Sequence, residues 1–355
     1  MSSVPRTGHP YHMHDAIYAQ PGVLRLVTRG QGDLLAMAAA AVAAAPHVWV
    51  AGLGSSWHAA LVGELLLAQV GRLGRRVRAV QTSDLLGYWP DPAGAAVVAV
   101  THRGSRDAGA ALARARAAGG AAVALIGKGV EGPAGATHVL RTVEQESSAC
   151  HTVGYTSALA MLAALAAAAG RDGEAAHEVD ALPDLVATLL GQEAWGELAA
   201  RFGGRRRYWC VGGGPNAATA YEAALKLNEA AWLPATGLTC EQFLHGAWTA
   251  LEPDDVVFLI APPGPAHARG HDVARVAAAI GAPVVALVAE DDRDIAPLAT
   301  ETIALPPVPE LLSPIVAVVP LQLLTYHLAV KAGADPDTMR AEQPGHARAR
   351  SILAP

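Results

Sequence analysis

The residues of this chain that are best suited to acid–base chemistry lie in the segment 211–251. Glu222, Lys226 and Glu229 are separated by four and three positions, so a helix places them on one face. Interconversion of an aldose and a ketose needs one group that opens the ring and another that moves a proton between C1 and C2. We expect His245 to open the ring and Glu229 to move the proton, with Lys226 beside them. Without further context, a surface position for Glu229 and a satisfied core position for His245 are the more common outcome for such residues.

Three loops that follow predicted strands carry groups suited to binding an anion. The segment 52–56 (GLGSS) leads directly into a predicted helix, so small residues, hydroxyls and a helix N-terminus come together, which favours phosphate. The segment 101–107 (THRGSRD) carries two arginines, and the segment 144–152 (EQESSACHT) offers hydroxyls before a long apolar helix. Helix capping and an exposed loop with Arg106 paired to an acid are the alternatives. We predict a ligand held by Gly54, Ser55, Ser56, Thr101, His102, Arg103, Arg106, Ser148 and His151.

Other ligand classes find little support in the sequence. The glycine loops do not match the GxGxxG or GxxxxGK[ST] patterns, which disfavours dinucleotides and nucleoside triphosphates, and we expect no cofactor. The three cysteines are far apart and lack CxxC spacing, which argues against a disulfide framework or a zinc site. The run HPYHMH, with His9, His12 and His14, offers a weak zinc or nickel site, but a flexible terminal tail is the simpler interpretation. We therefore predict no metal site.

The chain carries the same pattern of strands twice. Short apolar runs such as HVWVAGLGSS and RYWCVGGGPN alternate with alanine-rich helical segments, and five runs in the first half correspond in order to five runs about 160 residues later. Continuous Val, Ala and Leu runs are typical of parallel strands covered on both faces. We predict an α/β protein with two similar doubly wound parallel-sheet domains in tandem. Residues 1–180 would form the first with an N-terminal arm, and residues 181–355 the second with a C-terminal tail.

Composition indicates a compact protein that works on small molecules. Of the 355 residues, 52% are hydrophobic and 16% are charged, and the net charge of -6 offers no field that attracts nucleic acid or an anionic membrane. We interpret Arg201 and Arg205–Arg207 as an exposed helix end rather than a polyanion site. The apolar runs 149–170 and 311–330 are interpreted as buried helices rather than membrane spans. The first residues lack a signal pattern, so we expect a cytoplasmic protein.

Four segments together resemble a known family. They are HMHDAIYAQPGVL, EAALKLNEAAWLPATG, EQFLHG and LLSPIVAVVPLQLLTYHLA, and they span nearly the whole chain. They are similar to the double-SIS (sugar isomerase) domain family, which includes the isomerase half of glucosamine-6-phosphate synthase and the fructosamine-6-phosphate deglycases. The resemblance implies that Glu229 matches the proton-shuttling glutamate of the family's KLKE motif and His245 the ring-opening histidine of its HG motif. It also places Lys226 in the site, gives Ser55 and Ser56 to the sugar phosphate, and implies a homodimer in which the histidine comes from the neighbouring subunit.

Three departures from that family qualify the resemblance. Ser2 stands where the synthase's glutaminase domain has its nucleophilic cysteine, so we expect no glutaminase activity. The family's serine-rich SQSGET loop reads THRGSR here, which suggests a different grip on the anion. The synthase's tail lysine, which can form a Schiff base, has no counterpart, because the only lysines are Lys128, Lys226 and Lys331.

Two hypotheses of different classes follow. The first is an isomerase, deaminase or deglycase that acts on an amino-sugar or ketosamine phosphate by imidazole ring opening and carboxylate-mediated proton transfer. The second is a sugar-phosphate sensor or regulatory protein that has lost turnover, which the altered THRGSR loop and the missing tail lysine favour. Both predict a small sugar phosphate as the ligand and neither nucleic acid nor membrane as a partner.

Overall fold

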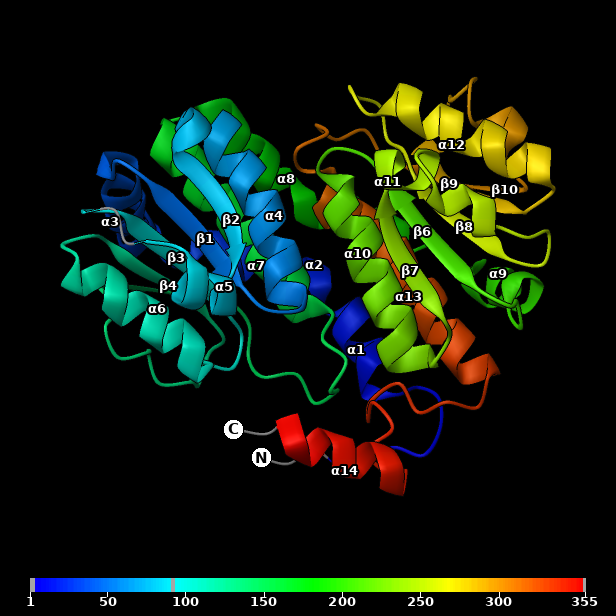
Figure 1. Cartoon of the computed structure of the whole chain (residues 1–355), viewed down its shortest axis with the longest axis horizontal. Helices are drawn as coiled ribbons and strands as arrows, with labels where there is room; N and C mark the ends of the chain where they lie inside the picture. Colours follow the sequence, from blue (N-terminus) through cyan, green and yellow to red (C-terminus); the bar gives the residue numbers. More distant parts are fainter. Residues whose placement is uncertain (1–3, 91–92, 354–355) are drawn as a thin grey trace.

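Two parallel five-stranded sheets organise the chain, and the computed structural model describes residues 4–90 and 93–353 (Figure 1). The first sheet contains β1 (Val48–Gly52), β2 (Val77–Gln81), β3 (Ala96–Thr101), β4 (Ala122–Ile126) and β5 (His138–Arg141). The second contains β6 (Tyr208–Gly212), β7 (Ala235–Thr239), β8 (Val256–Ile260), β9 (Val284–Ala289) and β10 (Glu301–Leu305). The spatial orders are β2-β1-β3-β4-β5 and, read from the matching edge, β7-β6-β8-β9-β10. The prediction of two similar doubly wound parallel sheets is confirmed.

Each central strand is apolar along its whole length because it is covered on both faces. In β1, Val48 pairs with Val77 of β2 and with Ala96 of β3, and all five residues are buried. Val48 and Val50 join one hydrophobic core, whereas the alternate residue Trp49 joins another on the opposite face. Because alternate residues are buried on opposite faces, the strand is apolar throughout and does not alternate between apolar and polar residues.

Helices cover both sheets. Those that connect two strands of one sheet are α4 (Ser55–Gln69), α5 (Thr82–Tyr88), α6 (Arg106–Ala117), α10 (Asn216–Lys226), α11 (Cys240–Leu244) and α12 (His267–Ile280). The remaining helices are α1 (His12–Tyr18), α2 (Gln20–Arg29), α3 (Gly32–Ala44), α7 (Val153–Gly170), α8 (Gly173–Leu190), α9 (Trp195–Phe202), α13 (Ser313–Lys331) and α14 (Pro344–Leu353). Short 3-10 turns are η1 (Gly74–Arg76), η3 (Ala247–Ala250) and η4 (Ala296–Leu298), and a π-helical turn, η2 (Leu227–Ala231), continues α10.

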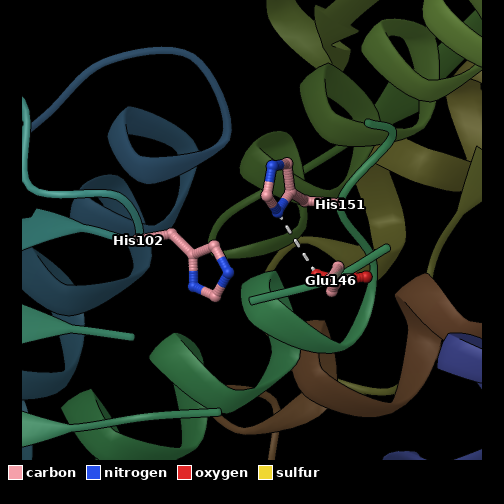
Figure 2. A group of neighbouring side chains, drawn as sticks. All are labelled: His102, Glu146 and His151. Atoms are coloured by element: carbon pink, nitrogen blue, oxygen red, sulfur yellow. Dashed lines mark ion pairs between the residues drawn. The ribbon is translucent and has the colours of Figure 1, made fainter. Parts of the chain in front are cut away.

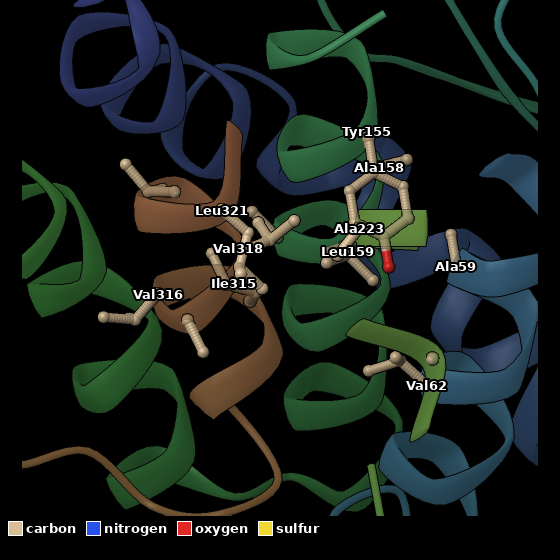
Figure 3. Close-up of a cluster of buried hydrophobic side chains, with 14 of the residues drawn as sticks. Ala59, Val62, Tyr155, Ala158, Leu159, Ala223, Ile315, Val316, Val318 and Leu321 are labelled. Atoms are coloured by element: carbon tan, nitrogen blue, oxygen red, sulfur yellow. The ribbon is translucent and has the colours of Figure 1, made fainter. Parts of the chain in front are cut away.

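A single hydrophobic core joins the two sheets. It contains residues from the inner faces of both sheets and from the helices α4, α7, α10 and α13, which pack on one another (Figure 3). The helices α7 and α13 are long and apolar enough to span a membrane, but 83% and 89% of their apolar windows are buried inside the protein. Helices that are apolar on all sides belong in the centre of a protein of this size. The interpretation of these two runs as buried helices is confirmed.

The N-terminal arm and α8 connect the two halves. α1 packs on α13 of the second half, while α2 packs on both α7 and α8. α8 also contacts α7 and α13, and the predicted division at residue 180 falls within this helix. The two halves are therefore packed as one body, and the boundary at residue 180 stays a prediction. Ser2 lies outside the described residues.

The basic cluster that follows α9 forms ion pairs around a buried carboxylate. Asp255 is fully buried and accepts hydrogen bonds from Arg206 Nε at 3.1 Å, Trp209 Nε1 at 3.0 Å and the Glu252 backbone N–H at 3.0 Å. Arg207 Nη2 lies 3.3 Å from the same carboxylate. These contacts join the start of β6 to the start of β8, so the cluster stabilises the second sheet and does not form a free polyanion site.

Burial alone would raise the pKa of Asp255, but the hydrogen bonds from Trp209, Glu252 and Arg207 outweigh it and hold the pKa below its usual value. A lowered pKa in the folded state gives stability that is present above the unfolded pKa of about 3.9 and is lost as the pH falls through the folded pKa. We expect Asp255→Asn to reduce the free energy of unfolding at pH 7 by about 2 kcal/mol, because the hydrogen bonds from Trp209, Arg206 and the Glu252 amide lose their charged acceptor. Urea unfolding measures this loss, which should shrink below about pH 4.

Asp254→Asn is the matched control. The Asp254 carboxylate also faces Arg206, at 3.3 Å, but its side chain is 65% exposed. Exposed ion pairs contribute less than about 1 kcal/mol, so this variant should unfold almost as the unmodified protein does. Equal losses in the two variants would contradict the role assigned to the buried carboxylate.

Candidate functional site

A cavity of about 260 Å³ opens at the carboxyl ends of the first sheet's strands, between that sheet and α10. Ligands of open parallel sheets are expected at such a position. Among the predicted residues, it is lined by Ser55, Ser56, His102, Arg103, His151, Lys226 and Glu229. The same cavity is also lined by Leu53, Ala59, Val100, Leu125, Thr142, Gly154, Tyr155 and Ala158. The structure thus brings the three predicted loops and the helix of the predicted acid together.

The GLGSS loop is a tight turn that starts α4 at the cavity. A Cβ on Gly52 would lie 2.2 Å from the Ser56 carbonyl oxygen, and Gly54 has a φ of +56°. Both positions therefore require glycine. Gly54 shapes the turn without lining the cavity, while Ser55 and Ser56 form the first turn of α4.

A buried ion network lies at the α10 side of the cavity. Lys226 Nζ is 2.5 Å from Glu229 Oε2 and 3.5 Å from Glu222 Oε1, which confirms that the three residues share one helix face. Glu222 accepts a hydrogen bond from Ser55 Oγ at 2.9 Å, and its other oxygen lies 2.7 Å from His58 Nδ1. The network therefore ties α4 of the first half to α10 of the second.

The network sets the charge of its members. Burial alone would raise the pKa of Glu222, but Lys226, His58 and Ser55 outweigh it and lower that pKa. Burial alone would lower the pKa of Lys226, but its neighbours, including Glu222 and Glu229, raise that pKa well above its usual value. Lys226 is thus a fixed cation and Glu222 its fixed counter-ion.

Glu229 differs from Glu222 because it reaches the cavity. It lies in the π-helical turn η2, its side chain is 18% exposed, and it lines the cavity, whereas the Glu222 side chain is fully buried. π-helical turns are frequent at functional sites. Cys150 Sγ donates to Glu229 Oε2 at 3.5 Å, and burial raises the pKa of this thiol well above its usual value. Glu229 is therefore the carboxylate of the network that can meet a ligand.

Two histidines that line the cavity, His102 and His151, lie close to the carboxylate of Glu146 (Figure 2). The rings of His102 and His151 lie 4.8 Å apart, and His151 Nδ1 is 3.4 Å from Glu146 Oε1. Burial lowers the pKa of His102 to about 4, so this ring is neutral at pH 7. Burial alone would raise the pKa of Glu146, but the adjacent His151 ring and the backbone N–H groups of Thr152 and Gly154 outweigh it and lower that pKa.

The other residues predicted to bind the ligand do not line the cavity. The Thr101 hydroxyl accepts from the Ser105 backbone N–H at 3.0 Å, and the buried Ser148 hydroxyl accepts from the Cys150 backbone N–H at 3.1 Å. Arg106 is the first residue of α6 and is exposed outside the cavity. Within one chain, Arg103 is thus the arginine of this loop that lines the cavity.

The structure of one chain does not bring His245 to this cavity. Its side chain is 75% exposed, and its Nε2 lies 3.1 Å from Glu241 Oε2, next to the C-terminus of α11. The alternative interpretations were a surface position for Glu229 and a core position for His245. Both are wrong, because the Glu229 side chain is 18% exposed and the His245 side chain is 75% exposed.

The histidines of the N-terminal arm do not converge on one point. His9 Nδ1 lies 2.7 Å from the Tyr326 hydroxyl, His12 Nε2 is 2.9 Å from the Val4 carbonyl oxygen, and His14 faces Asp15. These contacts hold the arm against α13 rather than leaving it as a free tail.

Sequence reasoning missed several residues of the site. His58 was detectable, because it lies three positions after Ser55 in a predicted helix and so shares its face. Glu146 lies in the EQESSACHT segment, but its approach to His102 depends on the tertiary structure, because the two residues come from different loops. No local sequence pattern predicted that Cys150 or Tyr155 would lie next to the cavity.

Comparison with known proteins agrees with this architecture. Residues 204–332 match the family model described as the SIS domain. The chain is 32% identical over 351 residues to a glutamine--fructose-6-phosphate aminotransferase [isomerizing] of Thermococcus kodakarensis, covering 94% of this chain and 58% of the relative. It is 30% identical over 344 residues to the protein of the same name from Pyrococcus horikoshii, covering 94% and 57%. The chain thus spans somewhat more than half the length of these relatives.

Solved structures share the fold over almost the whole chain. The C-terminal domain of glucosamine-fructose-6-phosphate aminotransferase from Francisella tularensis superposes with a TM-score of 0.80 at 17% identity, covering 94% of this chain and 99% of that one. Tagatose-6-phosphate ketose/aldose isomerase from Escherichia coli gives 0.79 at 17% identity, covering 96% and 98%. With its two sheets of one topology, the chain belongs to the SIS domain family and is built from two SIS-type domains in tandem.

Proposed function

We propose that this protein is an enzyme that acts on an amino-sugar or ketosamine phosphate, as an isomerase, deaminase or deglycase. The observation that carries the proposal is the cavity itself. Its lining combines a partly exposed carboxylate, Glu229, and a cation, Lys226, with Ser56 and Arg103, which are suited to a phosphate. The names of two similar proteins, which refer to fructose-6-phosphate and tagatose-6-phosphate, support a sugar phosphate as the ligand.

Glu229 is the proposed base that moves the proton between C1 and C2. Removal of that proton leaves negative charge on the adjacent sugar oxygen, and a fixed positive charge stabilises such an intermediate. Lys226 supplies this charge, because Glu222 and Glu229 keep its amine protonated. A protonated amine is not a nucleophile, so the proposed reaction proceeds without an imine on Lys226. Lys331 lies at the end of α13 and does not line the cavity.

The phosphate is proposed to lie at the first turn of α4, where the helix N-terminus favours an anion. Both serines line the cavity, but the Ser55 hydroxyl donates a hydrogen bond to Glu222. Arg103 reaches the cavity from the loop that precedes α6. In this proposal Ser56 and Arg103 bind the phosphate, and Ser55 positions Glu222.

His245 is proposed to act from a second copy of the chain. Its exposed position suits a residue that completes the cavity of a neighbour, as the family resemblance implies for a homodimer. The three cysteines are free and buried, in agreement with the proposed cytoplasmic location.

Glu229→Gln tests the central step. We expect incorporation of solvent deuterium at C1 or C2 of the sugar phosphate to fall by about a thousandfold, because an amide cannot accept the proton. NMR of the recovered substrate and product measures this exchange. Glu193→Gln, which alters an exposed acid outside the cavity, should leave exchange unchanged. Full exchange in the Glu229 variant would reject the assigned base, and binding without exchange in the unmodified protein would favour the sensor hypothesis.

The two arginines of the THRGSR loop give a paired test of phosphate binding. Arg103→Met should weaken binding of a hexosamine phosphate by tenfold or more, since a charged hydrogen bond contributes about 1.5 to 3 kcal/mol. Arg106→Met should change the affinity little, because this side chain lies outside the cavity. Calorimetric titration measures both affinities. A larger loss in the Arg106 variant would show that the phosphate lies elsewhere.

Subunit mixing tests the shared site. Glu229→Gln and His245→Ala should each be inactive alone, since each lacks one catalytic group. After equal amounts of the two variants are mixed and exchange subunits, roughly a quarter of the unmodified activity should return, because about half of the dimers are mixed and one of the two sites in each contains both native groups. Absence of any recovery, despite mixed dimers seen by mass spectrometry, would place both groups in one subunit or remove His245 from the reaction.

A further inference from the structure

The cluster of His102, Glu146 and His151 is not used by the proposed proton transfer. His102 comes from the loop after β3, whereas Glu146 and His151 flank the loop that leads into α7. One nitrogen or oxygen atom from each residue lies within 4.8 Å of the others (Figure 2). Within residues 4–90 and 93–353, this is the group of three or more histidine, cysteine or acidic side chains close enough to hold a metal ion.

We propose that His102, His151 and Glu146 bind one divalent transition-metal ion, with zinc the best fit to the ligands. Two imidazoles and one carboxylate are a set that zinc accepts in sites that keep an open position. Calcium and magnesium prefer sites made of oxygen ligands alone, so the two imidazole nitrogens disfavour them. This site goes beyond the proposed function, which requires no metal ion.

The ring nitrogens of the histidines are the first support for this site. Both His102 nitrogens are buried and make no hydrogen bond with described residues, while His151 Nδ1 faces Glu146 Oε1 at 3.4 Å. Buried polar atoms without partners are rare, because their burial costs free energy that a hydrogen bond or a metal ion recovers. In this cluster, the two such nitrogen atoms of His102 lie close to the paired His151 ring and Glu146 carboxylate.

Gly154 provides a second, independent indication. A Cβ at this position would lie 2.7 Å from Glu146 Oε1 and 3.4 Å from His102 Nδ1, so it would fill the space between two of the proposed ligands. Gly154 lies in the first turn of α7, where an alanine would serve the helix better. The glycine keeps the space between the two ligands open.

The carboxylate is oriented in the way that metal ligands usually are. Glu146 Oε2 accepts from the Thr152 backbone N–H at 2.9 Å and from the Thr152 hydroxyl at 3.1 Å. Glu146 Oε1 accepts from the Gly154 backbone N–H at 2.8 Å and faces His151 Nδ1 at 3.4 Å. Such outer hydrogen bonds hold a ligand in place and raise its affinity for a metal. Oε1 is therefore the oxygen directed at the site.

The distances between the ligand atoms suit one metal ion if the His102 side chain moves slightly. Zinc ligands at roughly 2.1 Å from the ion lie about 3.4 Å apart in a tetrahedral site, which is the separation between His151 Nδ1 and Glu146 Oε1. His102 needs to approach these two atoms, and its ring has no hydrogen bond to break. The fourth position faces the cavity that Glu229 and Lys226 also line, so an oxygen of a bound sugar or phosphate is its expected occupant.

The test measures metal binding and not turnover. Full-length protein is stripped with a chelator, dialysed, and titrated with Zn²⁺ by calorimetry and with Co²⁺ by visible absorption. We expect one tight ion per chain and a raised melting temperature on binding. His102→Gln and His151→Ala should each weaken Zn²⁺ binding by more than about a hundredfold, a larger loss than removal of an outer hydrogen bond causes. Glu146 is unsuitable for substitution, because it also caps α7.

A triple variant of the N-terminal arm, His9→Ala with His12→Ala and His14→Ala, is the control. It should retain the tight ion, because its three histidines lie outside the cavity. Loss of the ion in this variant, retention in both the His102 and His151 variants, or no tight binding in the unmodified protein would each overturn the proposal. Circular dichroism verifies that each variant is folded. Because binding is read without substrate, its failure is distinguishable from failure of the proposed enzyme activity.

Discussion

The buried charge of Lys226 is the constraint on which the rest of the site depends. An ammonium group without solvent is stable only beside carboxylates, and Glu222 and Glu229 provide them from the same helix. Glu222 in turn is satisfied by Ser55 and His58 of α4. The network thus requires α4 and α10 to lie side by side, and this contact forms one wall of the cavity.

Small residues let the helices around the network approach one another. A Cβ on Gly63 of α4 would lie 3.1 Å from the Leu162 side chain of α7, so glycine permits the close packing of these two helices. Ala59 and Ala223 belong to the same core (Figure 3). The abundance of alanine in these helices therefore reflects close packing as well as helix propensity.

The two halves share one topology but differ at the glycine loop that follows their first central strand. In the second half, the glycine loop after β6 corresponds to the GLGSS loop after β1. A Cβ on Gly214 would lie 3.5 Å from Glu310 Oε1, and the Glu310 carboxylate accepts from the Ala266 backbone N–H at 3.4 Å. Burial raises the pKa of this carboxyl group. An acid beside the loop disfavours a phosphate, so the anion site is expected in the first half alone.

The sequence predicted the features that depend on local spacing. The strands were recognisable because parallel strands buried on both faces are apolar throughout, and Lys226 and Glu229 because helical spacing fixes a common face. Arg103 and Arg106 were indistinguishable, since only the start of α6 at Arg106 turns one arginine away from the cavity. His245 could not be placed either, because the proposed contact with a second copy of the chain is not encoded in one chain's local pattern.

Three carboxylates beside one cavity illustrate how environment, and not residue type, assigns chemistry. Glu222 has no exposure and its oxygens are occupied by Ser55, His58 and Lys226, so it holds a charge in place. Glu146 is oriented by the amides of Thr152 and Gly154, which leaves one oxygen directed at two histidines. Glu229 alone combines an ion pair with exposure to the cavity, because the π-helical turn carries it there. A proton acceptor must be reached by the substrate, and this condition separates Glu229 from the two acids that position other groups.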